Sequence, residues 1–546
     1  MHLRRHRLLT ALSFLTLASG CQKPLAPAQP AAPPSGVRFA EVAEASGVKY
    51  TWTAPGKRPL TILQTIGNGC AFLDFNNDGN LDILLVGPKP ALFQGDGKGH
   101  FTEVTASVLG SLSGYFLGCA VGDYDGDGFP DLYLSGYREG RLLHNESGKR
   151  FADVTALSGL KPQPWGTSCG FADLNGDGKL DLYIANYAQF STTTQPQLCK
   201  FRTEKHGEVL SSCGPTRYIG LRGTLWQSNG KTFTDVSQAS GFSTQNGRGL
   251  GVAFADITGK GLTSVALAND EAPGDLFCAR GGGKFENTGQ ASGVATDSEG
   301  KVHGGMGIDW GDYDNDGKLD LFVATFRNEV KNLYHNDGDE AFSDKSNAVG
   351  IGQAALPYVA FGCKFLDADN DGWLDLIITN GHVQDNIELI EDTTYRQKTL
   401  FLHNQKGNFT DAGATSGIGN LAPIVGRGLA VGDFDNDGRV DALIVDSEGK
   451  PLLLHNESTP QGWVGFDCGG RYGAVLTLKL ADGQTRVRQC QSAGSYLSAS
   501  DSRVHFGLGT GQAQSLTVRW PSGKSETWKG FPTGRYLTLA PGQSPR

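Results

Sequence analysis

The stretch DFNNDGNLD at residues 74–82 gathers acidic and amide side chains around a single glycine. Five further copies fit the pattern D-x-[DN]-x-D-G-x-x-D, at residues 123–131, 173–181, 312–320, 367–375 and 433–441. A degenerate copy, DITGKGLTS, occupies residues 256–264. Apolar residues precede each copy, and a strand-like run such as LDILLV at 81–86 follows it. Each copy is therefore predicted to be an acidic loop between two strands.

A second pattern follows every loop: L-[FLY]-x-N, a turn, then F-x-[DE]-V, as in LLHNESGKRFADV at 142–154. It adds two strands, so each unit has four. Successive loops begin 49, 50, 83, 56, 55 and 66 residues apart, a spacing typical of propeller blades. The segment VRFAEV at 37–42 matches the last strand of a repeat unit whose earlier strands are missing. The segment PLLLHNES at 451–458 belongs to a unit that lacks this last strand. Pairing these two segments completes a seventh unit, which predicts an all-β fold with a seven-bladed β-propeller over residues 37–458.

The acidic loops have the composition of calcium sites. Ca²⁺ takes six or more oxygen ligands from a turn that can bend around it. Positions 1, 3, 5 and 9 offer carboxylate or amide oxygens, position 7 offers its backbone carbonyl, and Gly at position 6 permits the bend. The predicted ligands are Asp74, Asn76, Asp78, Asn80 and Asp82; Asp123, Asp125, Asp127, Phe129 and Asp131; Asp173, Asn175, Asp177, Lys179 and Asp181; Asp312, Asp314, Asp316, Lys318 and Asp320; Asp367, Asp369, Asp371, Trp373 and Asp375; and Asp433, Asp435, Asp437, Arg439 and Asp441.

Other readings of these loops are weaker. Asp, Asn and Gly favour turns without any ion, but several carboxylates in one nine-residue turn repel one another unless a cation is bound. An EF-hand needs Glu at position 12, where this chain has strand residues such as Leu85. Mg²⁺ prefers water-rich sites, and no His/Cys cluster suggests zinc. We expect about six Ca²⁺ ions, and none at 256–264, where Lys260 is expected to pair with Asp256.

Composition excludes several classes of protein. Gly fills 77 of 546 positions and Met only two, which favours short strands and tight turns over helices. The net charge is −9 and the only basic run is at the extreme N-terminus, so a nucleic-acid partner is not expected. No apolar stretch reaches the roughly 18 residues that a membrane-spanning helix needs.

The N-terminus has the pattern of an export signal. Basic residues including Arg4 precede an apolar segment at 8–17, and ASGC at 18–21 then matches a bacterial lipobox. We expect a lipoprotein signal peptide over 1–20, lipidation of Cys21, and a Pro/Ala-rich tether over 21–36. The alternative is an ordinary secretory signal cut nearby. Either way the protein is expected to be exported; with lipidation it is anchored at the bacterial cell envelope, on the outer membrane or cell surface.

Export permits disulfides. Four cysteines share a position with Val252, Ile308 and Leu429 of other repeats, which predicts buried, free thiols: Cys70, Cys119, Cys169 and Cys363. Two local disulfide candidates then remain, Cys199 with Cys213 and Cys468 with Cys490, and Cys278 is left unpaired.

The propeller face opposite the acidic loops gathers polar residues. Strand-two ends and strand-one starts meet there, and two long insertions, 188–222 and 382–399, leave from it. One reading is a polar ligand site roofed by the insertions; the other is that these residues cap strands and join blades. The candidates are Trp165, Asn186, Arg248, Asn269, Asp270, His303, Asn328, Asn380, His382 and Arg427.

These repeats resemble the FG-GAP/VCBS propellers of integrin α-subunits. Residues 462–540 resemble the ASPIC/UnbV domain, through GSYLSASDSRVHFGLG (494–509) and VRWPSGKSE (518–526). The combination resembles the cartilage acidic protein/UnbV family. That resemblance implies a propeller, calcium, and a small β domain over 459–546, whose alternating residues independently predict strands.

No nucleophile elbow, P-loop, post-strand GxGxxG or HExxH motif occurs, and no catalytic residue is predicted. We therefore expect a calcium-binding, surface-tethered module that binds protein or carbohydrate, contacts the membrane only through its lipid anchor, and is a monomer. The alternative is an extracytoplasmic enzyme, a polysaccharide lyase or oxidoreductase, that uses the face opposite the calcium loops.

Overall fold

The computed structural model describes residues 36–54, 56–193, 197–242 and 247–546. All of them lie in one compact unit, Pro34–Arg546. The predicted signal peptide, Cys21 and the tether up to residue 35 lie outside the described residues. In the described part of the chain, no helix has both the length and the apolar character needed to cross a bilayer.

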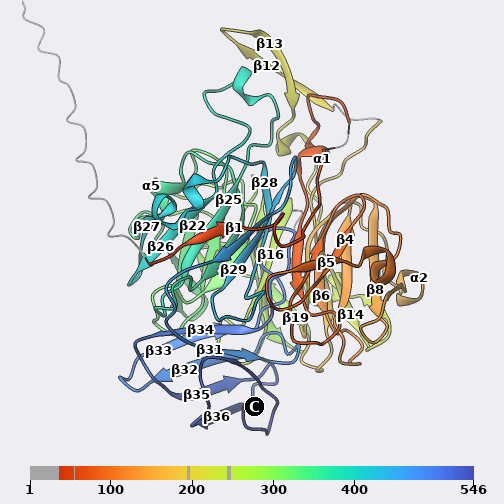
Figure 1. The fold of residues 1–546 in the computed structure, drawn as a ribbon. Coiled ribbons are helices and arrows are strands. Elements are labelled where there is room, and N and C mark those ends of the chain that lie inside the picture. Colours follow the sequence, from red (N-terminus) through yellow and green to blue (C-terminus); the bar gives the residue numbers. More distant parts are fainter. Residues whose placement is uncertain (1–35, 55, 194–196, 243–246) are drawn as a thin grey trace, which may run out of the picture. The chain divides into compact units, whose positions relative to one another are not determined.

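Seven four-stranded antiparallel sheets make up the described residues from 39 to 456 (Figure 1). Along the chain, the first sheet contains β2 (Cys70–Leu73), β3 (Asp82–Leu85), β4 (Ala91–Gly95) and β5 (Phe101–Glu103). The second contains β6 (Phe116–Gly122), β7 (Asp131–Gly136), β8 (Glu139–Asn145) and β9 (Phe151–Asp153). The third contains β10 (Gly166–Ala172), β11 (Asp181–Asn186), β14 (Thr224–Ser228) and β15 (Phe233–Asp235). The fourth contains β16 (Gly249–Ala255), β17 (Ser264–Asn269), β18 (Asp275–Gly281) and β19 (Lys284–Asn287).

The remaining three sheets repeat this arrangement. The fifth contains β20 (Ile308–Gly311), β21 (Asp320–Val323), β22 (Asn332–Gly338) and β23 (Ala341–Asp344). The sixth contains β24 (Ala360–Leu366), β25 (Asp375–Asn380), β26 (Leu400–Gln405) and β27 (Asn408–Asp411). The seventh contains β28 (Gly426–Gly432), β29 (Asp441–Asp446), β30 (Leu452–Asn456) and β1 (Phe39–Glu41).

The first strands of the sheets form a closed ring. Each packs on the next in the cyclic order β2, β6, β10, β16, β20, β24, β28 and back to β2. Most residues of these inner strands are small or apolar, as in FLGCAVG of β6, because both faces of the strands are buried. The arrangement is that of a β-propeller.

The ring closes through the N-terminal strand. β1 pairs antiparallel with β30, with Phe39 opposite Asn456 and Glu41 opposite Leu454. The predicted pairing of the two incomplete end segments is therefore confirmed. It protects the outer edge of β30, which would otherwise be an unpaired strand edge.

Helices are short and lie between sheets or in insertions. Most one-turn helices follow an outermost strand and stop at a left-handed glycine, such as Gly159 (φ 83°) and Gly241 (φ 102°). The helices are α1 (Ile62–Thr65), η1 (Thr105–Leu109), α2 (Thr155–Ser158), η2 (Pro215–Arg217), α3 (Ser237–Ser240), α4 (Gly289–Ser292), α5 (Ile351–Ala355), η3 (Ile387–Leu389), α6 (Gly413–Ser416) and η4 (Ile418–Asn420).

The C-terminal region forms two small sheets. One contains β34 (Val504–Gly509), β31 (Gly462–Asp467) and β37 (Tyr536–Thr538), with β31 and β37 parallel. The other contains β33 (Thr485–Gln489), β32 (Val475–Leu480), β35 (Ala513–Arg519) and β36 (Ser525–Lys529). Buried residues of both sheets, such as Phe466 and Leu476, share one apolar cluster with Tyr124 and Trp226 of the propeller.

A segment of this C-terminal region enters the centre of the ring. We call residues 492–501 the channel segment. Backbone N–H groups of Cys119 and Ile308 donate to its carbonyl oxygens (3.1 and 3.0 Å), and its own N–H groups donate to the oxygens of Cys70 and Val431 (3.0 Å each). These four partners belong to β6, β20, β2 and β28. The segment thus pairs with inner strands of the ring itself.

Serine side chains extend this pairing to two more inner strands. Leu497 N–H donates to Ser168 Oγ of β10 (2.9 Å), and Cys363 N–H of β24 donates to Ser495 Oγ (3.2 Å). Tyr496 and Leu497 are fully buried. The sequence analysis quoted this stretch only as part of a resemblance and did not predict its place inside the propeller.

The cysteines follow the predictions only in part. Cys199 and Cys213 form a disulfide with an S–S distance of 2.09 Å. Cys468 and Cys490 are buried free thiols, so the predicted second disulfide is not present. Cys490 begins the turn into the channel segment, and its thiol donates to the carbonyl oxygen of Ser502 (3.3 Å) instead of bonding to sulfur. The other described cysteines are also buried free thiols.

The channel segment requires a residue without a side chain beside it. A Cβ atom at Gly69 would lie 1.8 Å from the carbonyl oxygen of Leu497. We therefore expect Gly69→Ala to push the segment from its place and to lower the free energy of unfolding by about 1–3 kcal/mol, the usual cost of overpacking. Chemical denaturation measures the change. Gly214→Ala is the control, since its Cβ meets nothing within 4 Å; equal stability of the two variants would contradict the packing described here.

Candidate functional site

Each of the six acidic loops joins the first and second strands of its sheet, and one hydrogen-bond pattern recurs in all of them. The position-1 carboxylate accepts the N–H of the position-6 glycine, as in Asp123 with Gly128 (2.9 Å). The position-9 carboxylate accepts two backbone N–H groups, as in Asp131 with Tyr124 (3.1 Å) and Asn145 (2.8 Å). Since Asn145 is in the third strand, position 9 ties the loop to its blade. The same position-9 bonds are made by Asp82, Asp181, Asp320, Asp375 and Asp441.

Position 4 links neighbouring loops, a role that the sequence analysis missed. Its backbone is left-handed, with φ of 56° at Asn77 and 57° at Asn315. Where it is Asn, its amide donates to the glycine carbonyl of the next loop, as from Asn77 to Gly128 (2.7 Å). Equivalent bonds start from Asn315, Asn370 and Asn436. The signal was available, because position 4 is Asn or Gly in all six copies.

The carboxylates of a loop converge. Ligand atoms of Asp123, Asp125 and Asp131 lie within 4.8 Å of one another, and so do those of Asp312, Asp314 and Asp320. Burial, more than repulsion by neighbouring carboxylates, raises the pKa of Asp312 to about 7. It raises the pKa of Asp433 to about 7 and that of Asp82 to about 8 as well. The fold thus gathers acidic groups in places that disfavour their charge.

Three carboxylate oxygens of the loops also lack a partner. Oδ1 of Asp312 and of Asp367, both at position 1, and Oδ1 of Asp435, at position 3, are buried and accept no hydrogen bond from any residue that the structure describes. A buried carboxylate oxygen without a donor is costly unless a cation meets it. Hard oxygen donors of this kind, five or so around one turn, fit Ca²⁺.

The degenerate loop at 256–264 keeps the hydrogen-bond pattern of the others and forms an ion pair with an arginine. Asp256 accepts the N–H groups of Lys260 (3.2 Å) and Gly261 (2.8 Å), as an intact loop would. Its carboxylate meets the guanidinium of Arg519, from β35, at 2.9 Å. The predicted partner, the Lys260 ammonium, was wrong: Lys260 contributes its backbone, and the cation comes from the C-terminal domain. Positive charge therefore already occupies this loop.

Histidines lie beside the acidic loops, contrary to the sequence-based argument that no such cluster exists. Three groups of two aspartates and one histidine bring their ligand atoms within 4.8 Å: Asp125, Asp127 and His144; Asp314, Asp316 and His335; and Asp435, Asp437 and His455. Each histidine is the third residue of the L-[FLY]-x-N pattern, so its spacing from the loop was visible in the sequence.

The C-terminal domain covers part of the loop face. Gly507 N–H donates to Asp367 Oδ2 (3.2 Å), and Tyr536 Oη donates to Asp433 Oδ2 (3.0 Å). By contrast, a cavity of about 660 Å³ separates the domain from the loops that begin at Asp74 and Asp123. The six loops therefore differ in how far solvent reaches them.

On the opposite face, most of the predicted ligand-binding residues are buried and bonded to other parts of the propeller. Arg427 is fully buried and donates to the carbonyl oxygens of Thr65 (2.8 and 3.0 Å) and Gly381 (3.0 Å). The side-chain N–H groups of three buried asparagines each donate a hydrogen bond: Asn186 to Gln163 Oε1 (2.9 Å), Asn269 to Asp275 Oδ2 (2.8 Å) and Asn380 to the Lys398 carbonyl oxygen (2.7 Å). Trp165 and His382 are also buried, and burial lowers the pKa of His382 to about 3.

Four candidates keep some exposure: Arg248, Asp270, His303 and Asn328. Asp270 accepts a hydrogen bond from Tyr187 Oη (2.5 Å), and burial raises its pKa to about 7. Arg248 donates to the Asp270 carbonyl oxygen (2.8 Å). His303 lies 2.8 Å from Asp297. This is a small polar group beside the ring and not a continuous polar site.

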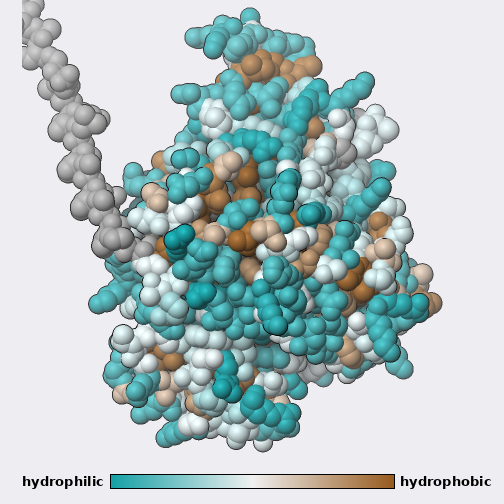
Figure 2. Space-filling model, viewed as in Figure 1, coloured by the Kyte–Doolittle hydropathy of each residue, from teal (hydrophilic) through white to brown (hydrophobic). Residues whose placement is uncertain are grey.

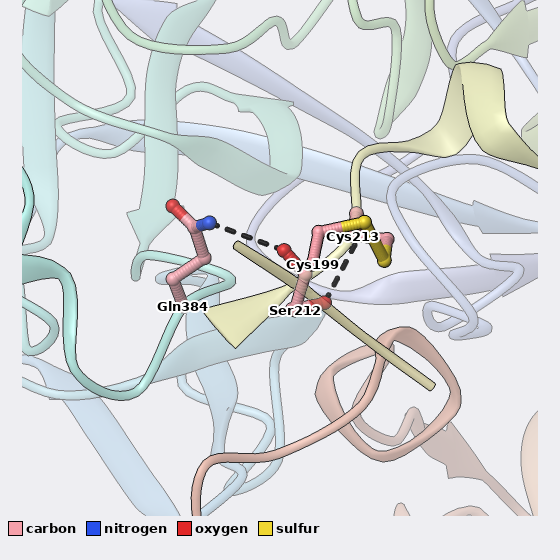
Figure 3. Close-up of a disulfide and its surroundings, with 4 residues drawn as sticks. All are labelled: Cys199, Ser212, Cys213 and Gln384. Carbon is pink, nitrogen blue, oxygen red and sulfur yellow. Dashed lines mark hydrogen bonds between the residues drawn. A yellow bond between two sulfur atoms is a disulfide. The ribbon is translucent and has the colours of Figure 1, made fainter. Parts of the chain in front are cut away.

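The two insertions meet on this face. The first contains β12 (Leu198–Thr203) and β13 (Gly207–Ser212), a hairpin that extends beyond the blades at the top of Figure 1. Figure 3 shows the Cys199–Cys213 disulfide at its base, with Gln384 of the second insertion donating to the Ser212 carbonyl oxygen (3.2 Å). Apolar surface shows on the hairpin in Figure 2, and Leu210 is 46% exposed.

Comparisons with known proteins agree with this architecture. The family profile described as FG-GAP-like repeat matches residues 74–134, 123–184, 256–323 and 312–378, and the profile described as ASPIC and UnbV matches 471–546. A lectin of Agrocybe aegerita has a similar fold, with a TM-score of 0.40 and 16% identity over 70% of this chain and 86% of the lectin. A rhamnogalacturonan lyase gives a TM-score of 0.32 and 12% identity over 83% and 93%. These structural likenesses concern the fold alone.

Among curated proteins, cartilage acidic protein 1 of Xenopus tropicalis is 25% identical over 500 residues, which are 84% of this chain and 70% of that protein. The human protein of that name is 26% identical over 309 residues, 53% of this chain and 43% of its own length. This chain thus matches less than half of the human protein. The chain therefore combines FG-GAP-like propeller repeats with an ASPIC and UnbV domain and is a homologue of cartilage acidic protein 1.

Proposed function

We propose that this chain is an exported, calcium-binding propeller module that binds protein or carbohydrate at the cell surface and has no catalytic role. It is lipid-anchored through Cys21 and acts as a monomer. The observation that carries the calcium assignment is the pair of buried, unpartnered carboxylate oxygens on Asp312 and Asp367, each at position 1 of an acidic loop.

Six loops support about six Ca²⁺ ions. Positions 1, 3, 5 and 9 would hold each ion with side-chain oxygens, and the position-7 carbonyl would add a further ligand. The ion would neutralise carboxylates that burial and mutual repulsion otherwise disfavour. The loop at 256–264 holds none, because Arg519 already neutralises Asp256.

Ligand binding is assigned to the face that carries the insertions. The disulfide at Cys199 and Cys213 and the bond from Gln384 brace the hairpin there, so a partner would meet a surface held in place. Exposed apolar side chains on that insertion, Leu210 (46%) and Ile219 (65%), suit a protein or a sugar face.

The alternative, an extracytoplasmic lyase or oxidoreductase, would use the polar group around Asp270. An aspartate whose pKa lies near 7, in contact with a tyrosine hydroxyl and close to an arginine, is a possible acid or base. Against it, most of the predicted polar residues are buried and already bonded within the propeller, as Arg427 illustrates.

The calcium assignment predicts a loss of metal that depends on the loop. Asp312→Asn should remove about one bound Ca²⁺ per chain, as measured by elemental analysis, because its loop loses the position-1 carboxylate. Asp256→Asn is the matched control and should leave the count unchanged. A chelator should lower the melting temperature of the wild-type protein by mass action. Two ions or fewer in the wild type would contradict the repeat-based assignment.

The proposed binding role predicts that the protein binds a ligand without converting it chemically. A screen of glycans and surface proteins against the wild-type protein, with calcium and with chelator, should give a binder that is retained only with calcium. Replacement of the hairpin 198–212 by a short Gly/Ser linker should abolish that binding while the calcium count stays the same. The enzyme alternative would be supported instead if a substrate were consumed and Asp270→Asn slowed its consumption at least tenfold.

A further inference from the structure

One residue of each third strand lies beside the acidic loop of its blade. It directly precedes the residue whose N–H donates to the position-9 side chain. It is His144 in β8, His335 in β22, His403 in β26 and His455 in β30, but Gln94 in β4 and Gln227 in β14.

The identity of this residue follows position 3 of the loop. The four loops with histidine have aspartate at position 3: Asp125, Asp314, Asp369 and Asp435. The two loops with glutamine have asparagine there: Asn76 and Asn175. The six complete repeats thus fall into two types, Asp/His and Asn/Gln, with no mixed case.

The histidines reach the carboxylates at positions 3 and 5. His335 Nε2 lies 3.2 Å from Asp314 Oδ2 and 3.5 Å from Asp316 Oδ2. His455 Nε2 lies 3.0 Å from Asp435 Oδ2 and 3.9 Å from Asp437 Oδ2. In both loops the imidazole meets the Oδ2 atoms of positions 3 and 5.

The other two histidines contact the carboxylate at position 9. His144 Nδ1 lies 3.3 Å from Asp125 Oδ2 and 3.1 Å from Asp131 Oδ1, so it touches positions 3 and 9. His403 Nδ1 lies 2.9 Å from Asp375 Oδ1, at position 9. Contact with position 3 is therefore established for three loops, those that begin at residues 123, 312 and 433.

In the Asn/Gln loops the asparagine supplies the same bond by itself. Asn76 Nδ2 donates to Asp78 Oδ2 (2.9 Å), and Asn175 Nδ2 donates to Asp177 Oδ2 (3.3 Å). An amide N–H thus contacts Oδ2 of position 5 in both loops. Where position 3 is aspartate it has no N–H to give. In the loops at 312–320 and 433–441, Oδ2 of position 5 is met instead by the side chain of position 7, Lys318 or Arg439, and by the imidazole at a longer distance.

Ring packing holds the imidazole in place. The aromatic residue at position 2 lies against it in the same three loops: Tyr124 on His144 (centroids 6.4 Å apart), Tyr313 on His335 (6.4 Å) and Phe434 on His455 (5.6 Å). A fixed imidazole fixes the carboxylates that it touches.

We propose that His144, His335 and His455 are positioning residues of the calcium loops, each matched to an aspartate at position 3. The imidazole holds the carboxylate at position 3 together with a second one, at position 5 for His335 and His455 and at position 9 for His144, so that these carboxylates keep the orientation in which they can meet the ion. This rests on the proposed calcium binding, and it adds that the loops form two types whose pairs of residues must change together.

The test is a set of matched exchanges, with calcium titrated calorimetrically into the full-length mature protein. The triple variant His144→Gln, His335→Gln and His455→Gln should weaken three of the sites about tenfold or more, the usual effect of losing such a partner. The triple variant Asp125→Asn, Asp314→Asn and Asp435→Asn should also weaken them, because an amide N–H would then face an imidazole N–H. His206→Gln, an exposed histidine in the hairpin turn, is the control.

Combining both triple variants creates three Asn/Gln loops, and their affinity should recover to that of the natural loops at 74–82 and 173–181. A combined loss equal to the product of the two separate losses would overturn the proposal, because uncoupled residues behave in that way. So would unchanged affinity in the histidine variant. If the wild type itself binds no calcium, the proposed function fails first, which is a distinguishable result.

A second exchange avoids the risk that these variants fold poorly. Asn175→Asp together with Gln227→His converts the loop at 173–181 to the Asp/His type. The double variant should bind calcium at least as tightly as the wild type, whereas Asn175→Asp alone should bind about tenfold more weakly than the double variant. Equal affinity of the single and double variants would contradict the pairing.

Discussion

In six blades, one buried aspartate carboxylate holds the acidic loop, the second strand and the third strand together. Asp131 shows the pattern: it begins β7 and accepts one N–H from its own loop and one from β8. Each such carboxylate brings a negative charge into an apolar blade, and burial raises its pKa, to about 7 in Asp181. The geometry that shapes the blade therefore also buries negative charge, which a bound cation of the proposed kind would neutralise.

The blade with the degenerate loop at 256–264 supports this interpretation, because it has no buried aspartate at position 9. Position 9 is Ser264 there, a neutral side chain whose Oγ accepts the N–H of Ala279 (3.2 Å) and so keeps the tie without the charge. The remaining charge, on Asp256, meets the guanidinium of Arg519. A covalently attached cation thus stands where the other loops would take a free one, and it comes from the domain that also supplies the channel segment. The ion pair of Asp256 and Arg519 is therefore also a contact between the C-terminal domain and the propeller.

The sequence predicted those features that repeat. Loop spacing predicted the blades, and the incomplete ends predicted the pairing of β1 with β30, because each depends on a pattern that recurs along the chain. It did not predict the channel segment or the pair of Asp256 and Arg519, which are 263 residues apart and occur once. A contact that occurs once, between residues far apart in the sequence, produces no repeating pattern from which it could be predicted. The histidines are an intermediate case, since they recur with the loops but show their meaning only when compared with position 3.

The candidate ligand face shows the same limit. Asn269 and Arg427 were chosen because polar residues end strands near the ring, yet burial and hydrogen bonds within the propeller engage both. Polarity at a strand end indicates a need for a partner, and the sequence cannot say whether that partner is a neighbouring blade or a ligand. The composition of the acidic loops is more specific, because repulsion among several carboxylates in one short turn must be relieved by protonation or by a cation.

The most direct test is a crystal structure of the protein grown with calcium, with anomalous scattering recorded at long wavelength. The account predicts one anomalous peak between positions 1 and 9 of each complete loop, beside Asp74, Asp123, Asp173, Asp312, Asp367 and Asp433, and none beside Asp256. Loops without peaks, their carboxylates joined only to water and protein, would contradict it.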